Sequence, residues 1–476
     1  MKTLSQFRSA MSGYFQEKQL GLASWILVLL SAALLFVFSL PYVIALRKML
    51  LLIAFLIASK SFLDALQKKP KPLLLVVLLV IILQLWMLVI AGLISDHPSS
   101  SFAEWRGQWL PTIMAFAIGV GLARTLAQSR LDDPRVAVAM IILVPITIFL
   151  GANAIVVIHS MIMEGKFLAY HTYHVGISDQ KANIGYLIAL LEPILIADML
   201  GRLVKRNTLF PLHRWAIPAI LALALFSLLA AFNRNGLLIM LLAFILGAVM
   251  MMAEIRKIYS PQKIIAVVLA TLVLIFAFAL IAYKTDPRWQ NFVETVPFAW
   301  DIDRDLLWLN NDESNPPLMP GGKPVEISAY DRIAWVHEGW RMLMAHPWGV
   351  EISRDTFHNL ELEKYGHAAM SHSHNSWIDF GLNVGIPGLL LWGGILLLLA
   401  QFGWQAWRTR QEPLGLALAV LVIIFAVRGL FDSIFRDHMI EQFMLVAGLL
   451  IGILTFGKKQ AISAQSNPND PLNSKI

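Results

Sequence analysis

Residues 371–403 read SHSHNSWIDFGLNVGIPGLLLWGGILLLLAQFG, a polar half followed by an apolar half. The apolar half, from Gly385 onward, is long enough to enter a bilayer core, which takes about 20 residues to cross. The polar half holds two histidines, two asparagines and an aspartate at the entrance of this helix. Such side chains are unfavourable in lipid unless they have partners. The stretch therefore predicts a membrane span that starts directly beneath a polar site.

The composition of the whole chain is that of a polytopic membrane protein. Its 476 residues are 58% hydrophobic and only 14% charged, and the mean hydropathy is +0.66. Soluble proteins carry roughly 25% charged residues. The chain has no cysteine, which excludes disulfides, zinc–thiolate sites, iron–sulfur clusters and thiol catalysis.

The apolar runs predict an all-α polytopic membrane protein with about twelve transmembrane helices. The second run is interrupted at its start by Arg47 and Lys48. The predicted spans lie near residues 20–40, 43–59, 73–95, 108–124, 136–158, 182–200, 215–232, 237–253, 264–283, 385–403, 413–428 and 441–456.

The positive charges indicate the orientation of these spans. With the N-terminus inside, the inner connections hold most of the lysines and arginines of the short connections, as the positive-inside rule requires. Both termini are therefore expected inside a bacterial inner membrane. The predicted order is transmembrane helices 1–9 in residues 1–283, a large periplasmic loop in 284–384, helices 10–12 in 385–460, and a polar cytoplasmic tail in 461–476.

The predicted periplasmic loop contains a helical pattern, SAYDRIAWVHEGWRMLMAHP at residues 328–347. Ser328, with Asp331 three positions later, is typical of a helix start, and Pro347 follows the expected end. Arg332 lies on this helix. The apolar face is expected to consist of Ile333, Val336, Trp340, Leu343 and Met344.

A second polar feature is expected on the same outer side. The segment AAFNRNGLLIM, residues 230–240, places Arg234 in a very tight connection between two apolar helices. An arginine at that depth needs an anion or a carboxylate, and the start of the following helix also favours anions. Together with His372, His374, Asn375 and Asp379, it indicates a cationic site with a titratable base. That pairing suits a reaction in which an anionic group leaves while a base takes up a proton.

These motifs resemble those of the O-antigen ligases, whose superfamily also includes O-antigen polymerases and bacterial protein O-oligosaccharyltransferases. His374-Asn375, nine intervening residues and GIPG (residues 385–388) are similar to the family's histidine motif. The connection at Arg234 resembles the family's arginine turn, although asparagines replace the usual serine and glycine around it. YDRIAWVHEGWRMLMAHPWG, residues 330–349, resembles the arginine-bearing loop helix, with Val350 where relatives often have glycine.

The resemblance implies a metal-independent, inverting glycosyl transfer. A ligase moves polysaccharide from undecaprenyl diphosphate to a sugar hydroxyl of lipid A–core. His374 is then the general base, and Arg234 and Arg332 hold the diphosphate. His372, Asn375 and Lys181 are expected in the surroundings of the site. We expect no cofactor, no bound metal and no nucleic acid partner.

Each of these residues also has a simpler interpretation. His374 could cap a loop helix, Arg234 could extend to lipid headgroups, and Arg332 could lie on a solvated face. His372 could belong to a metal site. The residues that remain with a simple interpretation are loop arginines 288, 304, 341 and 354. Arg428 and Arg436 could either contact a phosphate or sugar or pair with Asp432 or Asp437.

Three other functions remain open from the sequence. A polymerase or a protein O-oligosaccharyltransferase would share the donor chemistry, and hence the histidine and the arginines. A transporter would instead place ionisable groups at mid-span, where Glu192, followed by Pro193, is the one clear case. A structural scaffold would not need Arg234 in an apolar turn.

Overall fold

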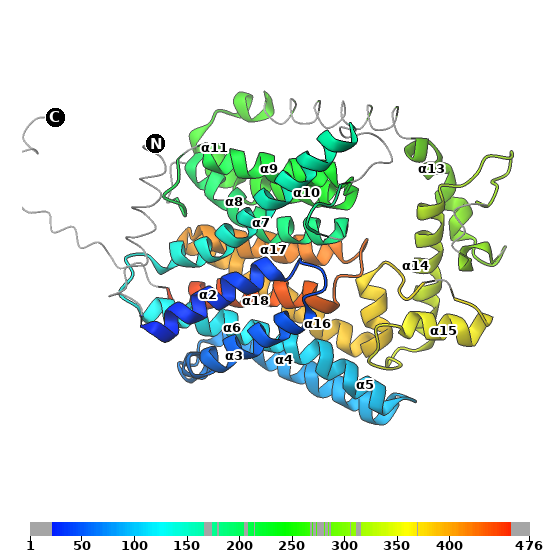
Figure 1. Ribbon diagram of the computed structural model, residues 1–476, viewed down its shortest axis with the longest axis horizontal. Helices are drawn as coiled ribbons and strands as arrows, with labels where there is room; N and C mark the ends of the chain where they lie inside the picture. The colour runs from blue at the N-terminus through cyan, green and yellow to red at the C-terminus, as the bar shows by residue number, and fades with distance from the viewer. Residues whose placement is uncertain are drawn as a thin grey trace, which may run out of the picture.

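The computed structural model contains only helices and their connections in the parts of the chain that it describes (Figure 1). These parts are residues 21–165, 174–178, 180–203, 208–213, 215–266, 287–304, 306–310, 316–368 and 370–457, with residues 269, 273, 280 and 284. Within them the β contacts are limited to one isolated bridge between Leu318 and Pro324. The predicted all-α class is confirmed for these residues.

The long helices pack side by side as a bundle (Figure 1). They are α2 (Leu22–Val37), α3 (Ile44–Gln67), α4 (Lys71–Val89), α6 (Leu110–Gln128), α7 (Pro134–Glu164), α8 (Lys181–Leu203), α9 (Ala216–Ala230), α10 (Arg234–Met250), α16 (Ser376–Arg410), α17 (Pro413–Arg428) and α18 (Asp437–Phe456). Shorter segments extend them, namely η1 (Ile90–Ile94), α5 (Pro98–Glu104), η2 (Trp105–Trp109) and α11 (Met252–Ile258). The connection before α16 carries α13 (Pro287–Trp300), η3 (Leu307–Leu309), α14 (Ile327–Ala345) and α15 (Thr356–Tyr365).

Seven of the described helices are long and apolar enough to cross a membrane, or eight if the bent pair α10–α11 is one span. Three shorter apolar helices, α2, α9 and α17, also lie at predicted spans. The predicted span at 264–283 falls mostly outside the described residues, as do residues 1–20 and the tail 461–476. The total of about twelve spans and the periplasmic position of the loop remain predictions.

Small residues bring α6 and α18 into backbone contact inside the bundle. A Cβ on Gly119 of α6 would lie 2.6 Å from the Leu449 nitrogen, and one on Gly448 of α18 would lie 2.5 Å from the Phe116 oxygen. Such close approach is a common way for helices to associate in lipid, where apolar burial alone does not hold them together. It places α18, most of which is buried, in the core.

Helix α16 is broken at Gly385, where the predicted span begins. Gly385 has φ 64° and ψ −176°, a combination that is essentially restricted to glycine. A Cβ there would lie 2.5 Å from the Pro347 oxygen and 2.6 Å from the Gly349 nitrogen. The Ile386 N–H also donates to the Pro347 carbonyl at 2.8 Å. The two glycine-containing motifs of the sequence therefore meet, and they fix the end of the loop segment against the start of the span.

Helix α14 lies across the end of the bundle (Figure 1), and the structure corrects two expectations about it. Its N-cap is Glu326, whose carboxylate accepts a backbone N–H of the first turn at 2.6 Å, so the predicted Ser328 cap is wrong. The predicted apolar face is wrong in part, because Trp340 and Met344 are exposed while Leu343 is buried. The side chains that pack inward are those of Tyr330, Ala334, Trp335, Met342 and Leu343.

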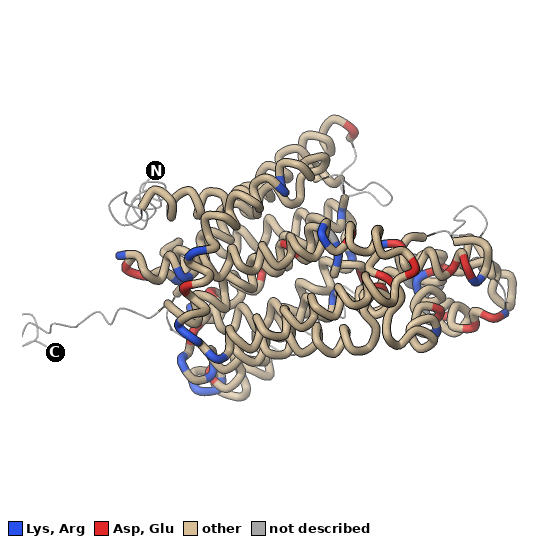
Figure 2. Tube along the Cα trace, turned by 90° about the horizontal axis from the view of Figure 1, so that it is seen from below, with Lys and Arg blue, Asp and Glu red and all other residues tan. Residues whose placement is uncertain are grey.

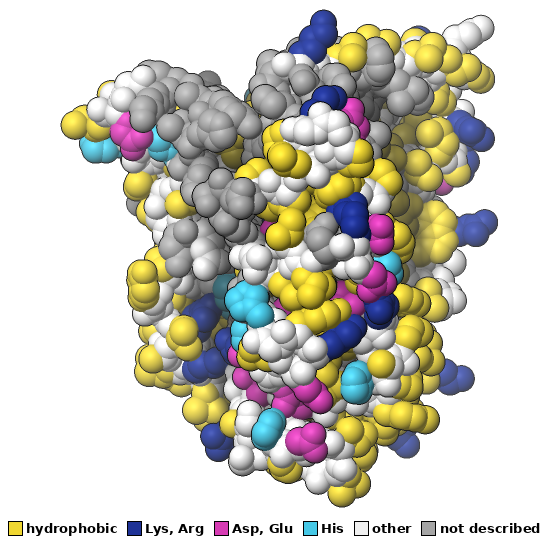
Figure 3. Space-filling view, turned by 90° about the vertical axis from the view of Figure 1, so that its right-hand side faces the viewer, with side chains coloured by type: hydrophobic (Ala, Val, Ile, Leu, Met, Phe, Trp, Pro, Cys, Tyr) yellow, Lys and Arg dark blue, Asp and Glu magenta, His cyan; other side chains and the backbone are white. Residues whose placement is uncertain are grey.

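The charged residues are unevenly distributed along the bundle. Lysines and arginines gather at the end of the bundle away from α13–α15, and a second group lies where the bundle meets those helices (Figure 2). On the surface formed at the α13–α15 end, basic, acidic and histidine side chains alternate with apolar ones (Figure 3). The polar groups of the candidate site belong to this second region.

Candidate active site

The histidine segment is held in place at the start of α16 by Asn375. The Asn375 Oδ1 accepts the N–H groups of Trp377 at 3.0 Å and Ile378 at 3.2 Å, which is the geometry of an N-cap. Its Nδ2 donates to the Leu430 carbonyl at 3.3 Å. Asn375 therefore caps the helix, and the interpretation of His374 as the cap is wrong.

His374 presents its ring beside α14. Its φ of 57° lies in the left-handed region, and the imidazole stacks on Trp335 with ring centroids 5.6 Å apart and planes 19° from parallel. Trp335 is only 3% exposed, so this surface is rigid. Among the described residues, none forms a hydrogen bond with the ring nitrogens of His374. The ring is therefore oriented by packing, and its nitrogens are available to a ligand.

His372 contacts both the ring and the backbone of His374. The two rings meet edge to face with centroids 4.3 Å apart, and His372 Nδ1 accepts the backbone N–H of His374 at 3.2 Å. The neutral His372 ring therefore carries its proton on Nε2. The Ser433 hydroxyl, also 3.2 Å from this Nδ1, donates to Asp379.

Asp379 joins the histidine segment to the connection between α17 and α18. Its Oδ1 accepts the Ser373 N–H at 2.8 Å and the Ser373 hydroxyl at 2.7 Å, and its Oδ2 accepts the Ser433 hydroxyl. Its position in the first turn of α16 is favourable for a negative charge. Asp379 therefore fixes the residue before His374.

Burial and nearby charges, including those of two arginines, lower the pKa of both histidines. Burial, together with the charges of His372, Arg332 and Arg436, lowers the pKa of His374 to about 3. Burial also lowers the pKa of His372, while the Asp379 carboxylate acts in the opposite direction. Arg332 is half-buried and its charge acts on both rings. Both imidazoles are neutral at neutral pH as a result.

Arg234 and Lys181 begin the two neighbouring helices α10 and α8. Asn233 caps α10 by accepting the Gly236 N–H at 2.8 Å, and its Nδ2 donates to the Lys181 carbonyl at 2.6 Å. The Lys181 side chain itself is exposed. The predicted arginine turn is thus a defined junction between two helix starts.

Asp432 connects this junction to the histidine segment. Its carboxylate accepts Asn235 Nδ2 at 3.2 Å and Arg428 Nε at 3.2 Å, and its backbone carbonyl accepts the Ser376 hydroxyl at 2.6 Å. The pairing of Arg428 with Asp432, one of the simple interpretations of the sequence, is thus confirmed. The structure places Arg332, His372 and His374 together, and Asp432 links Asn235, the residue after Arg234, to Ser376 at the start of α16.

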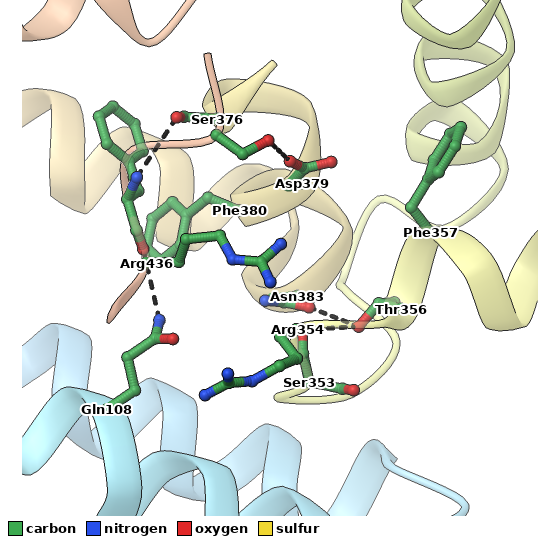
Figure 4. Close-up of a pocket in the computed structure, with 12 residues that line it drawn as sticks. Gln108, Ser353, Arg354, Thr356, Phe357, Ser376, Asp379, Phe380, Asn383 and Arg436 are labelled. Atoms are coloured by element: carbon green, nitrogen blue, oxygen red, sulfur yellow. Dashed lines mark hydrogen bonds between the residues drawn. The ribbon is translucent and has the colours of Figure 1, made fainter. Parts of the chain in front are cut away.

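A pocket of about 390 Å³ lies beside Asp379 (Figure 4). It is formed by η2, the segment before α15, the start of α16 and the connection before α18. Arg436 points toward Asn383 in this pocket. Arg354, which also lines it, forms an ion pair with Glu104 at 3.1 Å.

Trp335 and Ser433 contribute to the site but were not predicted for it, whereas Arg436 was predicted either to contact a phosphate or sugar or to pair with an aspartate. Trp335 lies one helical turn after Arg332, a spacing that could have indicated it. Ser433 and Arg436 come from a connection about sixty residues further along the chain, and their contribution depends on tertiary contacts. Sequence spacing carries no signal for such contacts.

The structure also bears on the metal alternative for His372. Among the described residues, no three histidine or carboxylate side chains are placed to hold one metal ion. His358, a possible partner, contacts the Met370 carbonyl at 3.2 Å instead, and His367 is exposed.

The apolar helices define a multi-pass membrane protein, and its polar site is built where the bundle meets the loop helices. Residues 219–393 match the family model described as O-antigen ligase. This match is consistent with the O-antigen ligase superfamily and, at a coarse level, with a transferase. The matched segment includes Arg234, Arg332 and the histidine segment, and ends before Ser433 and Arg436. No curated protein matches the chain.

Proposed function

We propose that the protein is an O-antigen ligase of the bacterial inner membrane. It transfers polysaccharide from undecaprenyl diphosphate to a sugar hydroxyl of lipid A–core, at a site on the periplasmic face. The observation that carries this proposal is the His374 imidazole, which is neutral and oriented by Trp335 and lies near Arg332 and Arg436. The family match supports a lipid-linked polysaccharide donor and a lipid acceptor.

The proposed reaction is a single displacement at the anomeric carbon of the donor. The acceptor oxygen forms a bond to that carbon while the bond from the carbon to the diphosphate oxygen breaks. The bonding electron pair leaves with the diphosphate, and the hydroxyl proton moves to His374. Attack opposite to the leaving group inverts the anomeric centre. Arg332 and Arg234 bind the diphosphate, because guanidinium groups pair with phosphate oxygens in a bidentate geometry.

The depressed pKa of His374 is compatible with this role. A base must be unprotonated before the substrate arrives, and burial of the ring, together with the charges of His372, Arg332 and Arg436, keeps His374 so. When a diphosphate binds to Arg332, its negative charge offsets that of the guanidinium, which raises the pKa of the imidazole. The histidine then becomes a stronger base in the substrate complex, where proton transfer takes place.

The residues around His374 have positioning roles in this proposal. Trp335 restricts the plane of the imidazole, and His372 contacts its edge. Asp379 and Ser433 hold the backbone and ring of the histidine segment. None of these contacts uses the ring nitrogens of His374, so they orient the base without competing for the proton.

A transfer assay tests the proposal. Purified wild type, His374→Ala and His367→Ala are given an undecaprenyl-diphosphate-linked glycan and lipid A–core in the presence of EDTA, and the product is followed on a gel. His367 is an exposed loop histidine and serves as the matched control. We expect transfer by wild type and His367→Ala, and a loss of about 10²–10⁴-fold for His374→Ala, the usual contribution of a general base.

The same assay separates the alternatives. If wild type leaves lipid A–core unmodified but extends a second glycan or modifies a protein, the activity is that of a polymerase or a protein O-oligosaccharyltransferase. If His374→Ala transfers as fast as wild type, His374 is not the base. If EDTA abolishes transfer and magnesium or manganese restores it, the metal-independent mechanism is wrong.

A further inference from the structure

The pocket beside Asp379 is separate from the residues proposed to hold the diphosphate. Neither Arg234 nor Arg332 lines it. It adjoins the histidine segment, because Asp379 and Ser433 belong both to its wall and to the hydrogen bonds that hold that segment. A transfer reaction has two substrates, so the second one needs a place next to the base.

The lining of the pocket is suited to a saccharide. The half-buried side chains of Asn383 and Ser353 carry neutral donors and acceptors, which match hydroxyl groups because these both donate and accept hydrogen bonds. The aromatic side chains of the lining, among them Phe380, are almost fully buried and form the floor of the pocket. A polyprenyl chain would require an apolar groove instead.

The charges in the pocket favour an anionic saccharide. Arg354 and Arg436 line it together with a single acidic residue, Asp379. The Asp379 carboxylate already accepts three hydrogen bonds, and Glu104 holds Arg354 in position. Arg436 points across the space toward Asn383 (Figure 4). A phosphate or a carboxylate on the saccharide would form charge-assisted hydrogen bonds with such guanidinium groups.

We propose that this pocket binds the acceptor saccharide, with an anionic substituent of the sugar held by Arg436 and Arg354. This inference rests on the proposed function for its reaction, because it places the acceptor hydroxyl beside His374. The binding itself is a separate property, which can be measured without any transfer.

The experiment measures binding of the core oligosaccharide in the absence of donor. The oligosaccharide is released from lipid A–core by mild acid, and one half is treated with phosphatase. Wild type, Arg436→Gln, Asn383→Ala and Arg304→Gln are compared by titration in detergent. Arg304 is an exposed arginine of the same loop segment, stacked on Phe298 and remote from the pocket lining, and it serves as the matched control.

We expect the Kd of the phosphorylated oligosaccharide to rise at least tenfold in Arg436→Gln, to rise in Asn383→Ala, and to stay unchanged in Arg304→Gln. Phosphatase treatment should weaken binding to wild type but not to Arg436→Gln, a pattern that a merely structural role of Arg436 would not give. If phosphatase changes nothing, the same pattern is expected after amidation of the carboxylates of the oligosaccharide; without it, the role of Arg436 is structural.

Two results would overturn the inference. One is the absence of binding by wild type at millimolar oligosaccharide, and the other is equal binding by wild type and Arg436→Gln. The proposed function fails independently if wild type binds the oligosaccharide but transfers no glycan to lipid A–core in the gel assay.

Discussion

Replacing Gly385 by alanine tests whether the break in α16 depends on contact between two backbones. The new methyl carbon would lie 2.5 Å from the Pro347 oxygen and 2.6 Å from the Gly349 nitrogen, and neither can move as a flexible side chain could. The backbone conformation of Gly385, with φ 64° and ψ −176°, is itself unfavourable for alanine. Both effects act against the folded state.

The expected loss follows from adding these two effects. A residue other than glycine in such a conformation costs about 1–3 kcal/mol, and an overpacked carbon costs about 1–3 kcal/mol. The free energy of unfolding of Gly385→Ala should therefore fall by about 2–6 kcal/mol. Glycosyl transfer should fall as well, because the displaced turn carries the histidine segment.

Gly393 provides a control within the same helix. A Cβ on Gly393 would have no neighbour within 4 Å, and glycine to alanine in an open helix interior gains up to about 1 kcal/mol. Both variants are unfolded thermally in detergent and followed by tryptophan fluorescence. We expect a lower Tm for Gly385→Ala and an equal or higher Tm for Gly393→Ala. Equal changes in the two variants would refute the reasoning, because the effect would then belong to α16 in general.

Three further predictions concern charge and protonation. Arg332→Gln should lower kcat/KM for glycan transfer by about 10²–10³-fold, the usual effect of removing a charge stabiliser, whereas an unchanged value in steady-state assays would remove Arg332 from the diphosphate site. The kcat/KM of wild type should stay level from pH 8 down to about pH 5. The reason is that kcat/KM reports the protonation of the free enzyme, in which the pKa of His374 is about 3. A fall of kcat/KM with an apparent pKa near 6.5 would contradict this prediction. Glu361 is fully buried, and burial, with the nearby Glu338 carboxylate, raises its pKa from 4.5 to about 8. Its stabilising contribution is complete below pH 4.5 and is lost as the pH rises through 8. Between these two pH values, the free energy of unfolding of wild type should therefore fall by on the order of 4 kcal/mol relative to that of Glu361→Gln. Parallel Tm–pH curves of the two proteins would refute the raised pKa of Glu361.

The positions of the apolar helices could be predicted because each span carries its own signal. A run of about 20 apolar residues is sufficient to indicate a span, and α16 indeed changes character at Gly385, where its predicted span begins. The glycines at 349 and 385 were quoted as motif positions, but their contact with each other depends on three-dimensional packing. The orientation in the membrane and the total number of spans stay predictions.

The candidate site was only partly predictable. His372, His374 and Arg332 lie together as expected, because the motifs mark them directly. Asn375 was assigned to the surroundings of the site, although an asparagine just before an apolar helix is also a typical N-cap signal, and the structure shows that it is the cap. The sequence left Arg436 open between a phosphate or sugar contact and a pair with an aspartate, and only the folded chain places it beside the histidines.

The break in α16 has a consequence for how substrates would meet. It separates the apolar part of the helix from residues 376–384, which lead to the histidines. Under the proposed function, both substrates are anchored by lipid chains, and a catalytic segment just beyond the end of a span meets them at the height of their headgroups. Their encounter is then lateral diffusion within a plane. The rate depends on the number of donor and acceptor molecules per area of membrane, and dilution of the surrounding aqueous compartment leaves it unchanged.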